Sequence, residues 1–141
     1  MTDAKLHGRG TIFIVEDERL MLRLVEKVLL QHGYQVLVAS DGEEAIEVYR
    51  RHKLEIDVVL LDVDLPKLTG WDVLLKMKEE NPDVRVVIAT GFLEPKMKTE
   101  MFRVTVKHFV DKPYMLDEVV ETLQTLIDAP VASSGSNTPV T

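Results

Sequence analysis

Short apolar runs alternate with segments of helical pattern along most of this chain of 141 residues. Five of the runs are apolar enough to form buried strands, and they cover residues 11–16, 34–40, 56–62, 86–89 and 108–111. Strands that alternate with helices indicate βαβ units, in which a parallel sheet is covered by helices on both faces. The sequence therefore predicts an α/β fold with a doubly wound, five-stranded parallel sheet of the (βα)5 type.

Two of the helices are predicted from apolar residues at helical spacing. Between the first two strands these residues are Leu20, Leu24, Val28 and Leu29, and Gly33 is placed to end the helix. The last helix has a longer apolar stripe, which comprises Leu116, Val119, Val120, Leu123, Leu126 and Ile127. Both patterns are typical of amphipathic helices.

Three further helices are indicated by their boundary signals. Asp41 and Glu44 have the spacing of a capping box, which opens a helix after the second strand. The helix after the third strand must end near Asn81, because Pro82 disfavours helical backbone in the residue before it. A shorter helix is expected over Pro95–Phe102, where the proline suits the first turn.

The length of the chain fits one domain with a single core. We place that domain at residues 10–128, after an N-terminal extension of residues 1–9. Residues 129–141 are rich in serine, proline and small side chains, which cannot bury much apolar area. They are expected to form a disordered tail or a linker.

Composition excludes several classes of function. The net charge of −7 argues against direct nucleic-acid binding, which depends on clustered lysine and arginine. The absence of cysteine excludes disulfides, thiolate metal sites and thiol nucleophiles. No segment approaches the ~20 apolar residues of a membrane helix, and the N-terminus lacks an apolar signal core. The expectation is a soluble cytoplasmic protein without membrane insertion.

Polar side chains stand at the ends of four of the five predicted strands. Glu16 and Asp17 follow the first strand, Asp62 ends the third, Thr90 ends the fourth and Lys112 follows the fifth. The carboxyl ends of parallel strands share one edge of the sheet, so these residues are expected to converge in one crevice. Three carboxylates would repel one another without a hard cation, and their oxygens suit Mg²⁺. The hydroxyl and the ammonium remain to hold an anion.

This set of residues resembles the receiver domain of two-component response regulators, which has a flavodoxin-like (CheY-like) fold. The resemblance covers about residues 10–128, and its specificity lies in the whole set of motifs and not in any one of them. The motifs are Glu16 with Asp17, Asp62 followed by Asp64, Leu65 and Pro66, Thr90 with Gly91, and Lys112 with Pro113.

The resemblance implies a role for each acidic residue. Asp62 is the nucleophile that takes the phosphoryl group. Asp17 and Asp62 bind Mg²⁺ directly, the backbone carbonyl of Asp64 supplies another oxygen, and Glu16 acts through a bound water. Receivers often carry aspartate at the position of Glu16.

The resemblance also implies a switch and a partner. Lys112, whose bond to Pro113 the family holds in the cis form, offsets charge on the transferring group. Thr90 donates to a phosphoryl oxygen, and the Phe109 ring then fills the space that Thr90 leaves. Such a domain is a phosphoacceptor that catalyses its own phosphorylation and dephosphorylation, not an enzyme with a separate substrate. The four histidines are scattered, so the donor is expected to be a sensor histidine kinase or a histidine phosphotransfer protein.

Two other functions stay open at this point. A pseudo-receiver would use the fold for binding without phosphorylation, although the complete acceptor set argues against it. A haloacid-dehalogenase-like phosphohydrolase would use Asp62 and Asp64 as nucleophile and acid, but its motif normally follows the first strand and lacks a proline at the position of Pro66. The sequence also leaves open a stand-alone regulator and the C-terminal receiver of a hybrid histidine kinase.

Overall fold

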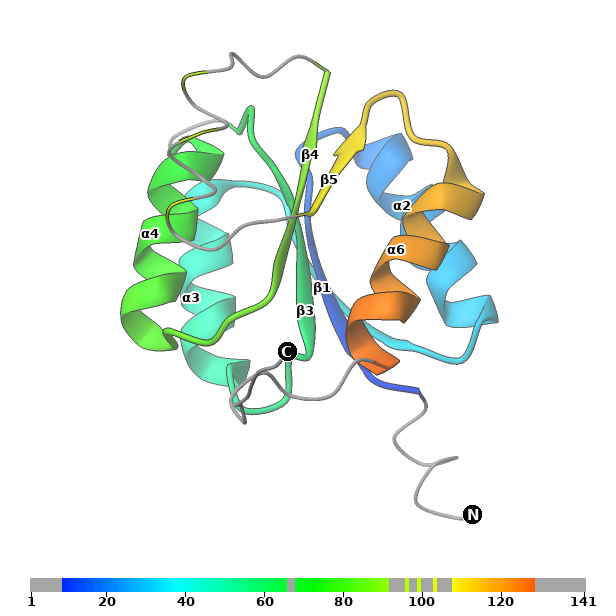
Figure 1. The fold of residues 1–141 in the computed structure, drawn as a ribbon, viewed down its shortest axis with the longest axis horizontal. Coiled ribbons are helices and arrows are strands. Elements are labelled where there is room, and N and C mark those ends of the chain that lie inside the picture. Colours follow the sequence, from blue (N-terminus) through cyan, green and yellow to red (C-terminus); the bar gives the residue numbers. More distant parts are fainter. Residues whose placement is uncertain are drawn as a thin grey trace.

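The computed structural model describes residues 9–65, 68–91 and 108–128, together with the single positions 96, 99 and 103. Five parallel strands form one sheet in the order β2-β1-β3-β4-β5 (Figure 1). The strands are β1 (Thr11–Val15), β2 (Gln35–Ala39), β3 (Val58–Asp62), β4 (Val86–Thr90) and β5 (His108–Asp111). The chain winds outward from β1 first to one side and then to the other. The predicted doubly wound, flavodoxin-like sheet is therefore confirmed.

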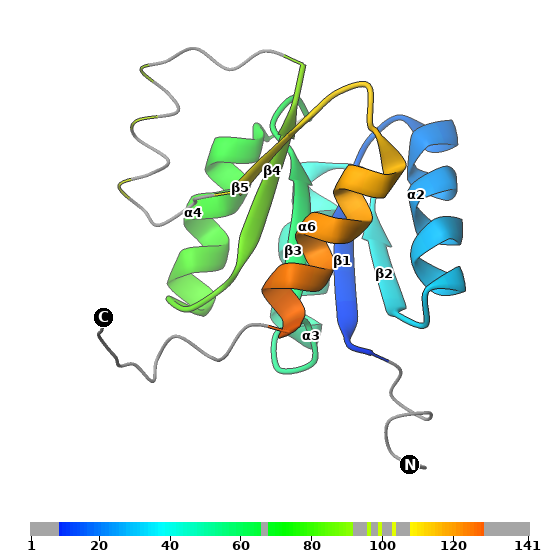
Figure 2. The ribbon, with the colours of Figure 1, turned by 45° about the vertical axis from the view of Figure 1, so that its right-hand side comes forward.

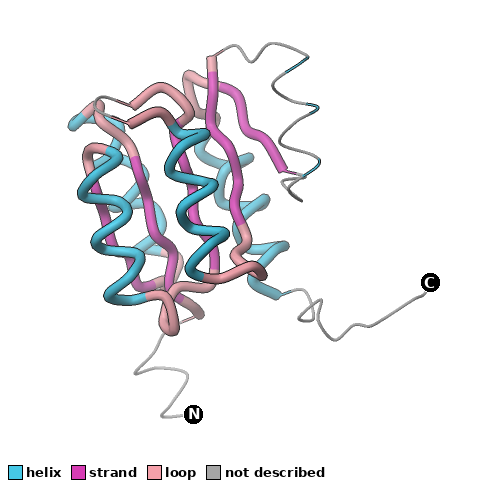
Figure 3. The backbone as a smooth tube through the Cα atoms, turned by 90° about the vertical axis from the view of Figure 1, so that its left-hand side faces the viewer, coloured by secondary structure: helices cyan, strands magenta, loops and turns pink. Residues whose placement is uncertain are grey.

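In the described residues, four helices cover the two faces of this sheet. One face is covered by α2 (Arg19–Gln31) and α6 (Leu116–Asp128), as Figure 2 shows. The other face is covered by α3 (Gly42–His52) and α4 (Gly70–Glu80), which lie side by side in Figure 3. The sheet is the middle layer of three, so its central strands are sealed from water on both sides.

The core is divided into two apolar clusters by the sheet. Along β1, Ile12 and Ile14 point toward α2 and α6, whereas Phe13 and Val15 point toward α3 and α4. This alternation follows from the two-residue period of a strand. All five residues of β1 are buried, and the same is true of β3 and β4. Polar side chains are therefore confined to the strand ends.

The predicted boundary signals are confirmed in the described residues. The Asp41 carboxylate accepts a hydrogen bond of 2.8 Å from the Glu44 N–H, and the Glu44 carboxylate accepts one of 2.8 Å from the N–H of Ser40. The helix α4 ends at Glu80, and Asn81 forms its C-cap, as Pro82 predicted. Gly33 follows the end of α2 with φ of +92°, a conformation that favours glycine. These caps place the strand ends that carry the site.

The buried face of α2 differs from the one that the sequence suggested. The helix buries Leu22, Val25 and Leu29. Leu20 and Leu24, which belong to the predicted stripe, are 82% and 44% exposed. The helix carries apolar residues on more than one side, and packing against α6 and the sheet selects the side that is buried.

Some predictions concern parts of the chain outside the described residues. These parts are residues 1–8, the expected helix over 95–102 apart from the single positions 96 and 99, and the tail over 129–141, so the domain limits remain a proposal. Arg9 already belongs to the folded unit, because its N–H donates to the Gly33 carbonyl at 2.9 Å and its guanidinium lies over the Tyr34 ring. Within the described residues, no helix has the length and apolar character needed to cross a membrane.

Candidate functional site

The strand register brings the predicted site residues to one edge of the sheet. Val15 pairs with Leu61, so Glu16 and Asp62 lie next to each other at the carboxyl ends of β1 and β3. Asp62 in turn pairs with Ala89, the residue before Thr90. These contacts confirm that the ends of neighbouring strands meet, as expected for a parallel sheet.

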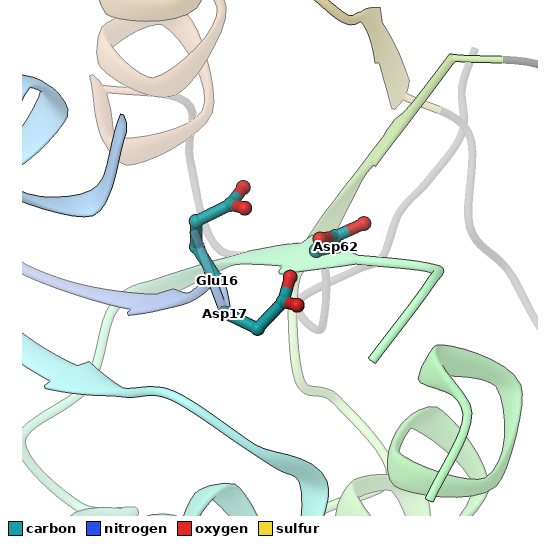
Figure 4. A group of neighbouring side chains, drawn as sticks. All are labelled: Glu16, Asp17 and Asp62. Atoms are coloured by element: carbon teal, nitrogen blue, oxygen red, sulfur yellow. The ribbon is translucent and has the colours of Figure 1, made fainter. Parts of the chain in front are cut away.

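Three carboxylates form a tight cluster at this edge. Glu16, Asp17 and Asp62 each offer one oxygen, and these oxygens all lie within 4.8 Å of one another. Glu16 and Asp62 are fully buried, while Asp17 is exposed. Figure 4 shows Asp17 turned toward Asp62, with Glu16 beside them. The cluster therefore has a buried floor and one side that solvent or a ligand can reach.

Lys112 supplies positive charge to the buried part of this cluster. Its ammonium nitrogen lies 3.1 Å from Oδ2 of Asp62 and 3.4 Å from Oε2 of Glu16. The backbone N–H of Lys112 donates to the Thr90 carbonyl at 3.0 Å, which ties the loop after β5 to the end of β4. The peptide bond from Lys112 to Pro113 is cis, as predicted. One cation thus bridges two buried anions.

Asp62 has a second hydrogen bond, from the loop that follows it. Its Oδ1 accepts from the backbone N–H of Asp64 at 3.0 Å. Both oxygens of Asp62 are therefore held, one by an N–H and one by the ammonium of Lys112. The Asp64 side chain is exposed, and the metal-binding role expected of its carbonyl remains a prediction.

Glu16 is held by a residue that the sequence analysis did not single out. The hydroxyl of Tyr114 donates to Oε1 of Glu16 at 3.0 Å, and the backbone N–H of Glu18 donates to Oε2 at 3.1 Å. The available signal was the place of Tyr114 two residues after Lys112, in the loop that delivers the lysine to the site. Its contact with Glu16 joins residues far apart in the chain, and no local pattern predicts it.

Burial and charge shift the protonation equilibria of the site. Burial raises the pKa of Asp62 to about 6; the N–H of Asp64 and the ammonium of Lys112 oppose the rise, and the charge of Glu16 adds to it. For Lys112, burial acts to lower the pKa, but hydrogen bonds and charge from Asp62 and Glu16 outweigh it and raise the pKa. Burial, followed by the charge of Glu16, also raises the pKa of Tyr114, so its hydroxyl keeps its proton.

The residues of the cluster fit a hard divalent cation. Among the described residues, three carboxylates face one ammonium, which leaves an excess of negative charge in a site with two fully buried acids. Such charge is costly unless a cation offsets it. Carboxylate oxygens suit Mg²⁺ better than softer metals, and the exposed side at Asp17 leaves room for the waters that Mg²⁺ keeps.

Thr90 and Phe109 lie on the same face of the sheet. Thr90 is 5% exposed and follows Ile88 by two residues, so the two side chains point to the same side of β4. Ile88 pairs with Phe109, whose half-buried ring packs against the core beneath α3 and α4. The arrangement is compatible with a Thr90 and Phe109 switch, whose operation remains a prediction.

A cleft of about 410 Å³ borders the exposed side of the cluster. It lies between the start of α2 and the loop after β2, and Asp17 forms part of its wall. Arg19, Arg23, Asp41 and Glu44 bring charge of both signs to the same cleft. Of the three clustered acids, Asp17 lines this cleft and the buried Glu16 and Asp62 do not.

Comparison with known proteins identifies the domain type. The family model of the response regulator receiver domain matches residues 12–124. A protein of Mycobacterium tuberculosis, named "Probable transcriptional regulatory protein TcrX", is 34% identical over 117 residues, which make up 83% of this chain and 49% of that protein. The chemotaxis protein CheY of Thermotoga maritima is 27% identical over 113 residues, which make up 79% of this chain and 92% of CheY.

A solved structure shows the same architecture. The response regulator receiver domain protein from Clostridium thermocellum matches with a TM-score of 0.78 at 26% identity, over 84% of this chain and 94% of that one. The chain thus spans about half the length of the mycobacterial relative and most of the length of CheY.

Proposed function

Because this chain belongs to the response regulator receiver domain family of two-component systems, we propose that it accepts a phosphoryl group on Asp62 in a step that depends on Mg²⁺. The observation that carries the proposal is the contact between buried Asp62 and Lys112 beside two further acids. A carboxylate buried at this cost without a functional partner would be unusual. In this proposal Asp62 is the acceptor, and Lys112 is the cation beside it.

The nucleophile is a carboxylate oxygen of Asp62. It attacks the phosphorus atom in line, a P–O bond forms, and the bond between phosphorus and the donor breaks. When the donor is a phosphohistidine, the imidazole nitrogen keeps the electron pair of the broken P–N bond. The hydrogen bonds from Asp64 and Lys112 hold the attacking group in place before the donor arrives.

Positive charge at the site stabilises the transferring group. The Lys112 ammonium already lies next to the nucleophile, and the Thr90 hydroxyl stands at the end of the adjacent strand. Asp17, Asp62 and the Asp64 carbonyl would hold Mg²⁺, with Glu16 acting through water. When bound, Mg²⁺ would offset negative charge on the phosphoryl oxygens and reduce repulsion among the acids.

The donor in this proposal is another protein. Three histidines lie in the described part of the chain: His32 and His52 at the ends of α2 and α3, and His108 at the start of β5. These positions belong to the edge of the sheet opposite Asp62. A sensor histidine kinase or a histidine phosphotransfer protein is therefore the proposed source. The proposal covers both a domain that acts alone and one within a hybrid kinase, because the relatives include CheY, of which the chain spans 92%, and a sensor kinase, of which it spans 13%.

The two alternative functions are less well supported. In Asp62, both carboxylate oxygens accept hydrogen bonds although the residue is buried. A pseudo-receiver, which is not phosphorylated, has no need of such an arrangement. A phosphohydrolase is disfavoured because the matching family is the receiver domain. Steady turnover of acetyl phosphate without a phosphorylated protein would favour the hydrolase, and absence of both turnover and mass gain would favour the pseudo-receiver.

Intact-mass spectrometry tests the proposal directly. Incubation with acetyl phosphate and Mg²⁺ should add one phosphoryl group to the wild-type protein, and EDTA should prevent this. Asp62→Asn should abolish the gain. Asp83→Asn is the matched control, since Asp83 is an exposed acid in the turn before β4. Equal labelling of Asp62→Asn and wild type would refute Asp62 as the acceptor.

A further inference from the structure

We propose that Tyr114 is a positioning residue of this site, whose hydroxyl holds the Glu16 carboxylate in the orientation that favours Mg²⁺ binding beside Asp62. The inference rests on the proposed function, because it concerns the same acidic cluster. Its basis is the hydrogen bond of 3.0 Å from the Tyr114 hydroxyl to Oε1 of Glu16. Glu16 is fully buried, so few other groups can reach it.

The two oxygens of Glu16 are held by donors from different parts of the chain. Oε2 accepts from Lys112 at 3.4 Å and from the Glu18 N–H at 3.1 Å. Oε1 accepts from Tyr114. The terminal torsion of a glutamate side chain is soft, so its carboxylate orientation is set by such donors and not by rotamer preference. Removal of the Tyr114 hydroxyl would leave Oε1 without this donor and free the carboxylate to turn.

The length of the Glu16 side chain matters for this contact. Glutamate carries its carboxylate one methylene farther than aspartate, through one additional carbon–carbon bond of about 1.5 Å. That extra reach lets Glu16, at the end of β1, meet Tyr114 in the loop after β5. An aspartate at this position would fall short of the hydroxyl. Glu16 and Tyr114 are therefore a matched pair, and their hydrogen bond is lost when either is changed.

Tyr114 and Lys112 come from the same loop and bind the same carboxylate. The loop after β5 is thus tied to Glu16 at two points, one through each oxygen. If Glu16 turns away, the ammonium of Lys112 loses one of its two anionic partners and its place beside Asp62 is less well fixed. Groups outside the direct ligands typically contribute about 10- to 100-fold to metal affinity, and Glu16, held by Tyr114, belongs to this outer set.

Titration calorimetry with MgCl₂ tests the role of Tyr114. Tyr114→Phe should raise the Kd for Mg²⁺ about tenfold relative to wild type, at a temperature where circular dichroism shows both proteins folded. The matched control is Tyr49→Phe. Tyr49 is buried on the opposite face of the sheet, and its hydroxyl accepts a hydrogen bond of 3.2 Å from Asn81. Tyr49→Phe loses a comparable hydroxyl and should bind Mg²⁺ like the wild type.

A double-mutant cycle separates positioning from a general structural effect. In a Glu16→Asp background, Tyr114→Phe should change the Kd less than about twofold, because the hydroxyl no longer reaches its acceptor. Unchanged affinity in Tyr114→Phe alone, or an equal loss in both backgrounds, would overturn the inference. A wild type that binds no Mg²⁺ and takes up no phosphoryl group would instead overturn the proposed function, and this inference with it.

Discussion

The ammonium of Lys112 lies 3.1 Å from the carboxylate of Asp62, although the two residues belong to the ends of strands that are not neighbours in the sheet. β4 lies between β3 and β5. The loop after β5 crosses the carboxyl end of β4, where the Lys112 N–H donates to the Thr90 carbonyl, and this brings the lysine side chain to Asp62. The ion pair is therefore a product of the strand order. It also gives the buried Asp62 carboxylate a partner of opposite charge in the absence of a ligand.

Lys112→Gln should slow phosphorylation more than it affects metal binding. Loss of a positioned charge at the transferring group costs about 100-fold or more in rate, by analogy with removal of one oxyanion donor. The initial rate of mass gain from acetyl phosphate would measure this. Lys27→Gln, at an exposed position on α2, is the control and should leave the rate unchanged. Calorimetry should show a much smaller change in Mg²⁺ affinity than in rate, since loss of the hydrogen bond from Lys112 to Glu16 is offset by removal of a charge that repels the cation.

Asp17→Ala should weaken Mg²⁺ binding. Asp17 contributes one of the three clustered carboxylates and lies on the exposed side of the site, where a hydrated ion can enter. We expect the Kd for Mg²⁺ to rise at least tenfold. Even residues that only hold the direct ligands contribute about 10- to 100-fold to metal affinity, and Asp17 is a proposed direct ligand. Calorimetry at constant ionic strength measures the change, with Asp83→Ala as the control. Equal affinity in Asp17→Ala and wild type would exclude Asp17 as a ligand.

Asp62→Asn should stabilise the metal-free protein at pH 8. The folded-state pKa of Asp62 is raised from the ordinary value of 3.8 to about 6, so the folded state binds more protons than the unfolded state between these values. The wild type therefore loses stability as the pH rises through this window, by at most about 3 kcal/mol. The neutral amide avoids the loss and should add about 1–3 kcal/mol to the free energy of unfolding.

Urea unfolding in EDTA, at pH 8 and at pH 4, checks this expectation. The difference between Asp62→Asn and wild type should be largest at pH 8 and should shrink at pH 4, near the lower end of the window. Asp83→Asn, an exposed acid, is the control and should match the wild type at both values. If Asp62→Asn were less stable than wild type at pH 8, burial and repulsion from Glu16 would not be what makes the ionised Asp62 carboxylate destabilising.

Two leucines on α2 test which face of the helix is buried. Leu22 is 5% exposed, whereas Leu20 is 82% exposed. Leu22→Ala should lower the free energy of unfolding by about 2–4 kcal/mol through lost burial and a residual cavity. Leu20→Ala should change it by less than about 0.5 kcal/mol. Chemical denaturation of the two variants measures both values, and similar losses would mean that the helix packs with a different face.

The sequence by itself determined the order of the elements and the edge at which function collects. Strand and helix patterns alternate, and local signals such as Asp41 with Glu44, or Pro82, fix where helices begin or end. In a parallel sheet, the carboxyl ends of all strands lie at the same edge. This is why Asp62 and Lys112 were predicted to meet from sequence alone.

Only the tertiary structure decided which side chains are buried and which pairs touch. α2 has apolar residues on more than one side, and its packing partners buried Leu22 and left Leu20 exposed. Glu16 and Asp17 are adjacent in sequence, yet one is buried and the other exposed. The hydroxyl of Tyr114 meets Glu16 through a contact between distant loops. Such outcomes depend on distances between elements, which periodicity and local signals do not encode.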